Sequence, residues 1–581
     1  MNVLGLYAQG PNTASCLVMD GYVVAFAEEE RFNRIKMASN FIPVKSTNYC
    51  LKKGGVTLDD IDVITVGWNH NAYPDEMRTF FENNMSHPDK DEYSAIYENI
   101  SLSEKDPVFY GKRLEMAFRR SGHRGQFPPV QYNNHHLSHA YSVFYPSPFN
   151  EAIILVVDGS GEEMGTSLWI GKDNKIEFKY KIDLPHSLGL YYMALTEYLG
   201  FSSYSGEGKV MGLAPYGNPN NEIREKLKNV MWIEGETYRV NPEYIYFHKR
   251  SYSFRHTDKL VNLLGSPPRV PESVIEPFYE DVAYEAQYLL EESVKHLVDK
   301  AIGKYNIRNI CIAGGVAMNC KMNGVISEHE GVQGCFVIPA SNDAGTALGS
   351  ALRQFRKDPE IRDKNKSFDV YSGPEFTNEE IEETLKKFKL DEYRLIEDEH
   401  LYDFVANKIY ERNIVGWFQG RMEVGSRALG NRSILADPRI PEMKDKVNRE
   451  VKHREPFRPF APSILEEYAQ DYIGDNKKSG NVNNHLWMLK ACFVEDSVRQ
   501  QIPSVVHKDG SIRPQIVSKS SNIRYHRLIS KFHEISGTPV LLNTSFNVRG
   551  EPIICRPDEA MRAFYSTGLD LLVMGNFVLE K

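Results

Sequence analysis

Two histidines spaced four residues apart could place both imidazoles on one face of a helix. His135 and His139 follow a pair of asparagines that would cap the start of that helix. Neutral imidazoles at this spacing chelate a divalent cation, and carboxylates from elsewhere in the chain would complete the site. Asp158 and Asp343 are the candidates, because each opens a loop after an apolar run. The pattern predicts a metal site with two nitrogen ligands, one or two carboxylate ligands and open positions.

The same residues allow a purely structural interpretation. His136 lies three residues before His139 and is an alternative ligand to His135. The histidines could instead cap or pack their helix, and Asp158 could be an ordinary carboxylate that caps a turn. The residues alone leave these alternatives open.

Three glycine-rich turns indicate phosphate binding, although each alone could be a tight turn. They are residues 158–161 (DGSG), 205–212 (SGEGKVMG) and 314–319 (GGVAMN). The first and third follow apolar runs, where glycine lets the backbone approach a ligand closely. Neither the P-loop nor the dinucleotide fingerprint is present, which disfavours P-loop kinases and Rossmann dehydrogenases.

A basic stretch with embedded arginines indicates an anion site. Between Arg421 and Arg458 the chain carries ten Lys or Arg residues against six acids. Guanidinium groups bind phosphate or carboxylate in bidentate fashion. A solvated charged helix suits residues 444–450, but it suits Arg427, Arg432 and Arg458 poorly, because these lie among Gly, Ala, Leu, Phe and Pro.

Farther along, residues 541–547 (LLNTSFN) place small polar side chains directly after an apolar run. Ligands of α/β proteins bind at such strand ends. Residues 509–514 (DGSIRP) form a polar turn that carries Arg513. Either segment alone could be a capped turn.

The elements that must position these residues follow a repeated pattern. Three short apolar runs, separated first by a polar loop and then by a turn, occur twice in the chain. This repetition indicates an internal duplication of a three-strand meander. A helix face from Val282 to Ala301 precedes a strand at residues 310–313. With its two meanders and its glycine-rich turns, the chain resembles the superfamily that contains acetate and sugar kinases, heat-shock chaperones and actin. The repeated runs are residues 3–7, 14–19 and 22–27, then 152–157, 165–171 and 176–182.

Composition limits the class of protein. With 581 residues, 41% of them hydrophobic, the chain is long enough for two to four compact units. Its net charge of −9 removes a global electrostatic case for nucleic-acid binding. We expect no membrane span, a cytoplasmic location and, from seven scattered cysteines, reduced thiols. A polar segment at residues 361–375 predicts a linker, followed by an α/β unit with strands near residues 414–418, 540–542 and 571–574.

The whole chain resembles the NodU/CmcH family of carbamoyltransferases, which includes antibiotic O-carbamoyltransferases such as the tobramycin enzyme. Seven ordered motifs carry this resemblance. They are residues 27–32 (AEEERF), 135–140 (HHLSHA), 208–217 (GKVMGLAPYG), 314–319 (GGVAMN), 425–433 (GSRALGNRS), 457–462 (FRPFAP) and 542–547 (LNTSFN).

The resemblance implies an α/β protein with two catalytic units. Residues 1–360 would form a duplicated ribonuclease-H-like domain similar to the tRNA threonylcarbamoyl transferase, and residues 376–581 a YrdC-like domain. The C-terminal domain would convert carbamoyl phosphate and ATP to carbamoyl adenylate and pyrophosphate. The N-terminal domain would pass the carbamoyl group to an acceptor hydroxyl and release AMP, with iron(II) as the usual metal.

The resemblance also assigns residues. It implies that His135, His139, Asp158 and Asp343 hold the metal. It implies that Lys209, Gly314, Gly315 and Asn319 contact the adenylate. It implies that carbamoyl phosphate and the ATP phosphates are gripped by Arg427, Lys452 and Asn543, in catalytic roles, and by Arg458, Arg513 and Ser545.

One position departs from the family pattern. Asn12 stands where members often carry a histidine that can serve as general base, so the base is unassigned here. The expected acceptor is a small molecule, a sugar or a modified nucleoside or nucleotide, recognised by loops at residues 73–119 and 234–277. We expect no membrane partner and no stable nucleic-acid partner, and the sequence leaves the oligomeric state open, a homodimer included. The alternatives are a fused tRNA threonylcarbamoylation enzyme and a non-catalytic, actin-like nucleotide-binding module.

Overall fold

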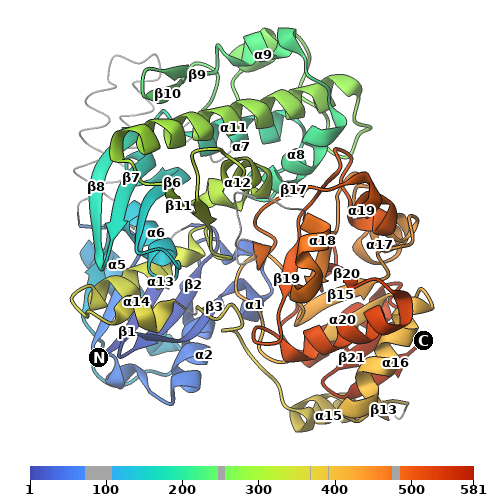
Figure 1. Cartoon of the computed structure of the whole chain (residues 1–581). Helices are drawn as coiled ribbons and strands as arrows, with labels where there is room; N and C mark the ends of the chain where they lie inside the picture. Colours follow the sequence, from blue (N-terminus) through green and yellow to red (C-terminus); the bar gives the residue numbers. More distant parts are fainter. Residues whose placement is uncertain (9, 72–106, 247–254, 367, 390–391, 474–484) are drawn as a thin grey trace. The chain divides into compact units, whose positions relative to one another are not determined.

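The computed structural model (Figure 1) describes residues 1–8, 10–71, 107–246, 255–366, 368–389, 392–473 and 485–581. Most of the first predicted acceptor loop, and part of the second, lie outside these residues. The chain forms two compact units. Unit 1 comprises Met1–Glu29 and Ala38–Phe368, and unit 2 comprises Glu30–Met37 and Asp369–Lys581. Sequence reasoning placed residues 30–37 with the N-terminal domain, but their contacts group them with unit 2.

The first sheet of unit 1 is built on the first predicted meander. Its strand order is β3-β2-β1-β4-β5, in which β1 pairs antiparallel with β2 and parallel with β4. Gly5 in β1 is required by close packing, because a Cβ there would lie 1.9 Å from the Ala347 carbonyl oxygen. The strands are β1 (Asn2–Tyr7), β2 (Ala14–Met19), β3 (Tyr22–Glu28), β4 (Val63–Val66) and β5 (Val130–Tyr132).

The second sheet of unit 1 has the same strand order and directions. The order β8-β7-β6-β11-β12 again joins an antiparallel meander to two parallel strands. The prediction of a loop over residues 158–161 is wrong, because β6 continues through a bulge to the Gly161–Met164 pair. The strands are β6 (Glu151–Gly161), β7 (Met164–Lys172), β8 (Lys175–Asp183), β11 (Asn309–Ala313) and β12 (Gly334–Phe336).

A helix rich in small residues packs closely against the strands of the first sheet. Helix α13 (Ala344–Leu352) is buried along its whole length and contacts β1, β2 and helix α6 (His135–Phe144). A Cβ at Gly349 would lie 1.7 Å from the Ser138 carbonyl oxygen, so α13 and α6 cross almost backbone to backbone. The predicted face from Val282 to Ala301 is confirmed as the buried side of α11 (Pro277–Tyr305).

The remaining elements of unit 1 extend these layers. Helix α14 starts the segment expected as a linker, and its Arg362 and Asn365 are buried against unit 1. The elements are α2 (Val44–Gly54), α5 (Pro107–Arg120), α7 (Leu188–Tyr198), α8 (Glu207–Leu213), α9 (Asn221–Leu227), β9 (Met231–Glu234), β10 (Thr237–Val240), α10 (Asp258–Leu264), α12 (Cys320–Ser327) and α14 (Ile361–Asn365).

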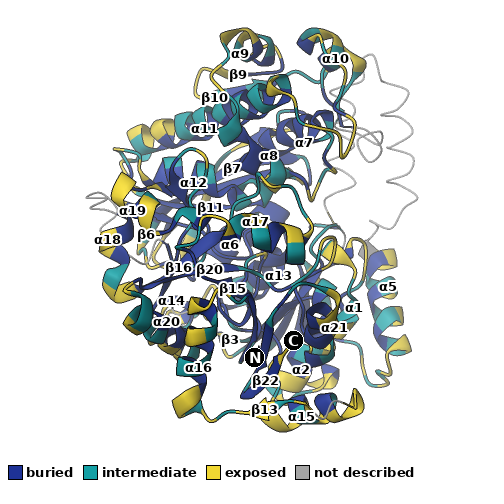
Figure 2. Cartoon of the chain, turned by 90° about the vertical axis from the view of Figure 1, so that its right-hand side faces the viewer, coloured by how far each residue is buried: buried dark blue, intermediate teal, exposed yellow. Residues whose placement is uncertain are grey.

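Unit 2 is built around an eight-stranded sheet in the order β13-β22-β21-β14-β15-β20-β16-β19. Successive residues point to opposite faces, so Phe418 packs in one core and Trp417 in the other. Figure 2 shows the inner strands buried and the outer helices with exposed faces. The strands are β13 (Arg394–Leu395), β14 (Val415–Phe418), β15 (Arg432–Ala436), β16 (Ala461–Leu465), β19 (Gln515–Val517), β20 (Val540–Ser545), β21 (Leu571–Met574) and β22 (Phe577–Glu580).

Helices cover both faces of this sheet. The core that contains Trp417 includes residues of α16 and α20, and the core that contains Phe418 includes residues of α15, α17 and α21. Among the described residues, no helix has the length and apolar character needed to cross a membrane. The helices and short strands are α1 (Glu30–Asn33), α15 (Asn378–Lys387), α16 (Asp398–Tyr410), α17 (Met443–Val447), α18 (Ala469–Ile473), β17 (Cys492–Phe493), α19 (Asp496–Gln501), β18 (Ser511–Ile512), α20 (Ile523–Ser536) and α21 (Pro557–Ser566).

Candidate functional site

The four predicted metal ligands of unit 1 meet in one buried cluster. One ligand atom from each of His135, His139, Asp158 and Asp343 lies within 4.8 Å of the others. The Nε2 atoms of His135 and His139 are 3.2 Å apart, and Asp158 Oδ2 lies 3.1 Å from His139 Nε2. Asp343 Oδ1 is 3.8 Å from His135 Nε2. Three elements supply these groups: helix α6, strand β6 and the residue that precedes α13.

Hydrogen bonds around the cluster orient its ligands. The Asn134 side chain accepts from the Leu137 N–H and starts α6. His135 Nδ1 lies 2.8 Å from the Gly67 carbonyl oxygen, which can only accept, so Nδ1 carries the hydrogen. The Nε2 lone pair of His135 therefore faces His139. The Tyr7 hydroxyl donates to Asp343 Oδ2 at 2.6 Å and holds that carboxylate in place.

His136 is oriented away from this role. Its Nδ1 lies 2.8 Å from the Ser167 hydroxyl, whereas its ring is not part of the four-residue cluster. The structure therefore favours His135 over His136 as the second histidine of the cluster.

Charges in the cluster favour a bound cation. Burial alone would raise the pKa of Asp158, but the adjacent His135 and His139 take that pKa well below its ordinary value. Burial, followed by the nearby charge of Asp158, raises the pKa of Asp343 to about 7. Asp158 Oδ2 is buried and accepts no hydrogen bond from the described residues. Two facing imidazole nitrogens and an unsatisfied carboxylate oxygen form a donor set that fits a divalent cation.

The predicted adenylate-binding glycines adjoin this cluster. Gly314 has a φ of 91°, and a Cβ there would lie 2.2 Å from the Val157 carbonyl oxygen. A Cβ at Gly315 would lie 3.1 Å from Asp158 Oδ1. The turn at residues 314–319 therefore runs directly against the end of β6, where only glycine permits such an approach.

The two other predicted nucleotide contacts have structural partners in unit 1. Asn319 caps α12 by accepting from the Met322 N–H, and its amide also pairs with Gln287 on α11. The Lys209 ammonium on α8 lies 5.3 Å from the centre of the Phe201 ring. Both α8 and α12 contact α11.

Unit 2 contains a basic pocket of about 230 Å³. All six residues predicted to grip carbamoyl phosphate and the ATP phosphates line it: Arg427, Lys452, Arg458, Arg513, Asn543 and Ser545. The site prediction omitted four further cationic side chains that line the pocket: Arg31, Lys36, Arg454 and Arg549. Its acidic lining residues are Glu30 and Glu551. Eight cations against two acids make this an anion-binding pocket by charge.

The end of strand β20 contributes Asn543, Thr544 and Ser545 to the lining of the basic pocket. The expectation that residues 543–545 follow the strand is wrong, because β20 pairs with β15 up to Ser545. Asn543 Nδ2 donates to the Ser463 hydroxyl at 3.0 Å, while Asn543 Oδ1 is buried and accepts no hydrogen bond from the described residues. That oxygen is an unused acceptor in a pocket otherwise rich in donors.

Glu423 organises the loop that carries Arg427. One of its carboxylate oxygens accepts from the N–H groups of Leu429, Asn431 and Arg432 at 2.7 to 3.1 Å. Gly430, at a φ of 101°, leaves no room for a side chain, since a Cβ would lie 2.1 Å from the Tyr525 ring. The loop geometry is thus held by buried contacts rather than by the pocket residues themselves.

The cationic groups destabilise one another in the absence of an anion. Burial, with repulsion from Arg454, Arg458 and Lys36, lowers the pKa of Lys452 well below its ordinary value. Burial and the neighbouring Arg458 and Arg513 also lower the pKa of Arg454 well below its ordinary value. The Lys452 ammonium donates to the Ser545 and Asn547 carbonyl oxygens, at 2.7 and 2.9 Å.

The anion-binding role expected of Arg432 is wrong. Its side chain is fully buried, donates to the carbonyl oxygens of Gln419 and Pro374, and lies over the Phe418 ring at 3.7 Å. Arg432 has a structural role, because its guanidinium donates hydrogen bonds to backbone carbonyl oxygens inside unit 2. Two of the four missed cations, Arg31 and Lys36, lie some 400 residues before the basic stretch, where no local pattern connects them to the pocket.

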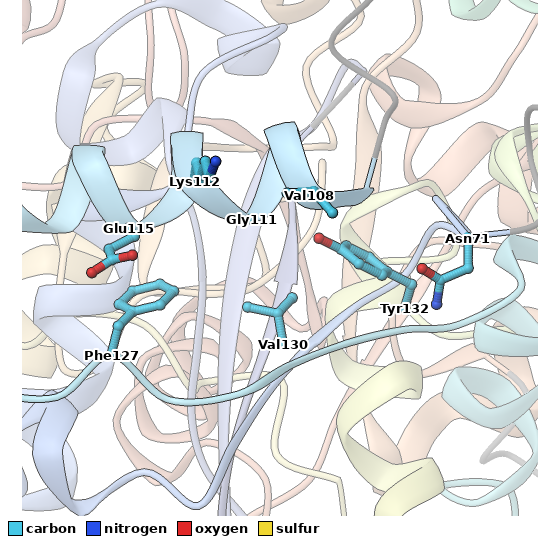
Figure 3. A pocket seen from close by; sticks show the side chains of 8 residues that line it. All are labelled: Asn71, Val108, Gly111, Lys112, Glu115, Phe127, Val130 and Tyr132. Carbon is cyan, nitrogen blue, oxygen red and sulfur yellow. The ribbon is translucent and has the colours of Figure 1, made fainter. Parts of the chain in front are cut away.

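A second, shallow hollow of about 410 Å³ lies in unit 1 and contains none of the predicted site residues. Figure 3 shows helix α5 above it, Val130 and Tyr132 of β5 below, and Phe127 and Asn71 at its two ends. Its walls are largely apolar, with Lys112 and Glu115 on the helix side.

Comparisons with known proteins match both parts of the chain. The family described as Carbamoyltransferase N-terminus matches residues 2–352, and the family described as Carbamoyltransferase C-terminus matches residues 406–581. The solved structure of HypF from T. kodakarensis covers 63% of this chain and 49% of its own, at 14% identity and a TM-score of 0.32. That similarity is too low to define the fold of either unit.

Relatives of full or partial length agree with the family matches. An uncharacterized protein of Synechocystis sp. is 38% identical over 100% of this chain and 97% of its own. Nodulation protein NolNO of Sinorhizobium fredii is 34% identical over 98% of this chain and 80% of its own. The 3'-hydroxymethylcephem-O-carbamoyltransferase of Amycolatopsis lactamdurans is 34% identical over 46% of this chain and 47% of its own. The chain therefore belongs to the carbamoyltransferase family and is an enzyme of that family.

Proposed function

We propose that this enzyme is an ATP-dependent O-carbamoyltransferase that activates carbamoyl phosphate in unit 2 and transfers the carbamoyl group to a hydroxyl in unit 1. The observation that carries the proposal is the basic pocket, which gathers Arg427, Lys452, Arg458 and Arg513 around Asn543 and Ser545. Phosphoryl chemistry relies on fixed donors of this kind, because negative charge moves among phosphate oxygens in the transition state.

The balance of atoms defines two steps in the proposed activation. Water first releases phosphate from carbamoyl phosphate and leaves carbamate. A carbamate oxygen then attacks the α-phosphorus of ATP, and pyrophosphate departs as carbamoyl adenylate forms. Arg458 and Arg513 would bind the phosphate oxygens, and the Asn543 carbonyl oxygen would accept from the carbamoyl NH₂. A YrdC-like fold for residues 376–581 is part of this proposal.

The cluster in unit 1 fits a divalent metal, and we propose iron(II), which the family resemblance implies. His135, His139, Asp158 and Asp343 would hold it, since the two Nε2 lone pairs and the unsatisfied Asp158 oxygen converge. When bound, the metal supplies a Lewis acid that can polarise a carbonyl or phosphate oxygen. Gly314 and Gly315 let the nucleotide approach the end of β6. We propose Lys209 and Asn319 as further nucleotide contacts of the ribonuclease-H-like domain.

In the proposed transfer step, the acceptor oxygen forms a bond to the carbamoyl carbon, the bond to AMP breaks, and the hydroxyl proton is released to solvent. The relatives include an enzyme named for O-carbamoylation of a hydroxymethyl cephem, so an alcohol of a small molecule is the proposed acceptor class. Asn12, which has a φ of 66°, occupies a left-handed conformation that asparagine tolerates, and it cannot serve as a base near neutral pH.

Product analysis tests the proposal without knowledge of the acceptor. Purified enzyme would be incubated with ATP, with and without carbamoyl phosphate. The proposal predicts AMP-linked carbamoyl product and pyrophosphate only when both are present. Formation of ADP, or of pyrophosphate without carbamoyl phosphate, would contradict it.

A further inference from the structure

An eight-residue segment of the early chain is built into unit 2. Glu30–Met37, here called the strap, groups with unit 2, whereas its neighbours Glu29 and Ala38 belong to unit 1. The chain thus leaves unit 1, contributes to the basic pocket through Arg31 and Lys36, and returns. Part of the pocket lining therefore comes from a segment that is joined to unit 1 at both ends.

Two arginines fasten the strap to the two loops that line the pocket. Arg31 Nη2 donates to the Gly425 carbonyl oxygen at 2.7 Å, next to Ser426 and Arg427 of the lining. Arg34 donates to the carbonyl oxygens of Ile553 and Pro552, at 2.7 and 2.9 Å. Both of those residues line the pocket.

An ion pair strengthens the second fastening. Arg34 Nη1 lies 3.3 Å from Glu559 Oε2, and the Glu559 side chain is 6% exposed. Glu559 also accepts from the Cys555 N–H at 2.7 Å, so its carboxylate is held in place. A guanidinium that satisfies two carbonyls and one buried carboxylate cannot be replaced by a point charge such as lysine without loss of contacts.

The strap is held under backbone strain beside like charges. Arg34 and Met37 adopt φ values of 63° and 65°, which bulky side chains rarely do. The Met37 N–H donates to Glu30 and closes the turn that presents Lys36. Lys36 faces Lys452 and its cationic neighbours, so an empty pocket repels it and an anion attracts it.

The two residues that flank the strap, Glu29 and Ala38, are both hydrogen-bonded to Thr13 of unit 1. The Glu29 N–H donates to the Thr13 carbonyl oxygen at 2.8 Å, and the Thr13 hydroxyl donates to the Ala38 carbonyl oxygen at 2.8 Å. The Asn40 N–H donates to the Gly10 carbonyl oxygen. Three hydrogen bonds therefore join residues 10–13 to the chain on either side of the strap.

We propose that the strap reports anion occupancy of the basic pocket to residues 10–13 of unit 1, with Arg34 as the positioning residue that keeps it attached. The inference deepens the proposed function and rests on its anion pocket. An anion draws Lys36 inward, and the strap then restrains Glu29, Ala38 and the loop that Thr13 anchors. The two sites are linked because the anion binds more tightly when Lys36 is drawn inward than when it is not.

Hydrogen–deuterium exchange of the full chain tests this, with inorganic pyrophosphate as the probe and titration calorimetry as a check on binding. In the wild type, pyrophosphate should slow exchange in peptides covering residues 10–13 and 30–37. Arg34→Ala should bind about tenfold more weakly and, at saturating pyrophosphate, should lose the protection at residues 10–13. Arg562→Ala, a side chain that is 70% exposed, is the matched control and should behave as the wild type.

The outcomes separate the two proposals. A wild type that fails to bind pyrophosphate overturns the anion pocket and the strap with it. Binding without protection at residues 10–13, or protection that survives in Arg34→Ala, overturns the strap alone. Should Arg34→Ala fail to fold, Glu559→Gln removes the ion pair and keeps a hydrogen-bonding group in place, and it should show the same loss in weaker form.

Discussion

Replacement of Arg458 by alanine should weaken the use of carbamoyl phosphate about a hundredfold without loss of folding. Arg458 lines the basic pocket, and its side chain is 34% exposed. A hydrogen bond to a charged group contributes about 1.5–3 kcal/mol, and a charge pair at about 4 Å contributes up to about 4 kcal/mol at an effective dielectric constant of about 20. Partial exposure reduces this, so about 3 kcal/mol is expected, which corresponds to about a hundredfold.

The same truncation should leave the free protein as stable as before. Burial and the neighbouring Arg513 and Arg549 lower the pKa of Arg458, whereas Glu455, at 3.7 Å, opposes that shift. Loss of a charge that its surroundings disfavour does not reduce the free energy of unfolding. The assay is carbamoyl-phosphate-dependent pyrophosphate release, with Arg562→Ala as control and thermal unfolding as the stability check. An unchanged KM for carbamoyl phosphate in a folded Arg458→Ala variant would refute the assignment.

Three further predictions concern metal, pH and packing. His139→Ala should lose bound metal by elemental analysis after reconstitution, and a full metal complement would refute the ligand assignment. Burial and the nearby Lys490 lower the pKa of His485 to about 3, from about 6.5 in the unfolded chain. Between these values only the unfolded chain binds the proton, so the free energy of unfolding falls as the pH drops below about 6.5. From pH 7 to 5 this group alone contributes a loss of about 2 kcal/mol, which His485→Phe should abolish in denaturant titrations. Gly430→Ala should cost about 2–5 kcal/mol in the same titrations because of its positive φ and the Tyr525 contact, and an unchanged midpoint would contradict the loop geometry.

Local patterns predicted the elements well. Elements that depend on residues close together in the sequence could be predicted. They are the meander around the Asp20-Gly21 turn, the capped start of α6 and the buried face of α11. The sequence could also indicate Asp158 and Asp343, because each lies at or near the end of an apolar run. Their convergence with the two histidines depends on α13 crossing α6, which no local pattern specifies.

Long-range grouping could not be read from the sequence. Arg432 and Arg458 have similar neighbours in the chain, yet one braces backbone carbonyls inside unit 2 and the other lines the pocket. Arg31 and Lys36 precede the basic stretch by some 400 residues, and only the fold reveals that they join it. Side-chain chemistry predicted the kind of ligand, whereas tertiary packing decided which residues meet it.

The most direct test of the proposed function is release of pyrophosphate and phosphate by purified enzyme supplied with ATP, in a titration of carbamoyl phosphate without acceptor. We predict that pyrophosphate forms only with carbamoyl phosphate and that Arg458→Ala shifts the titration about a hundredfold. ATP left untouched at every carbamoyl phosphate concentration, or converted only to ADP, would contradict the assignment of the basic pocket in unit 2 as the activation site.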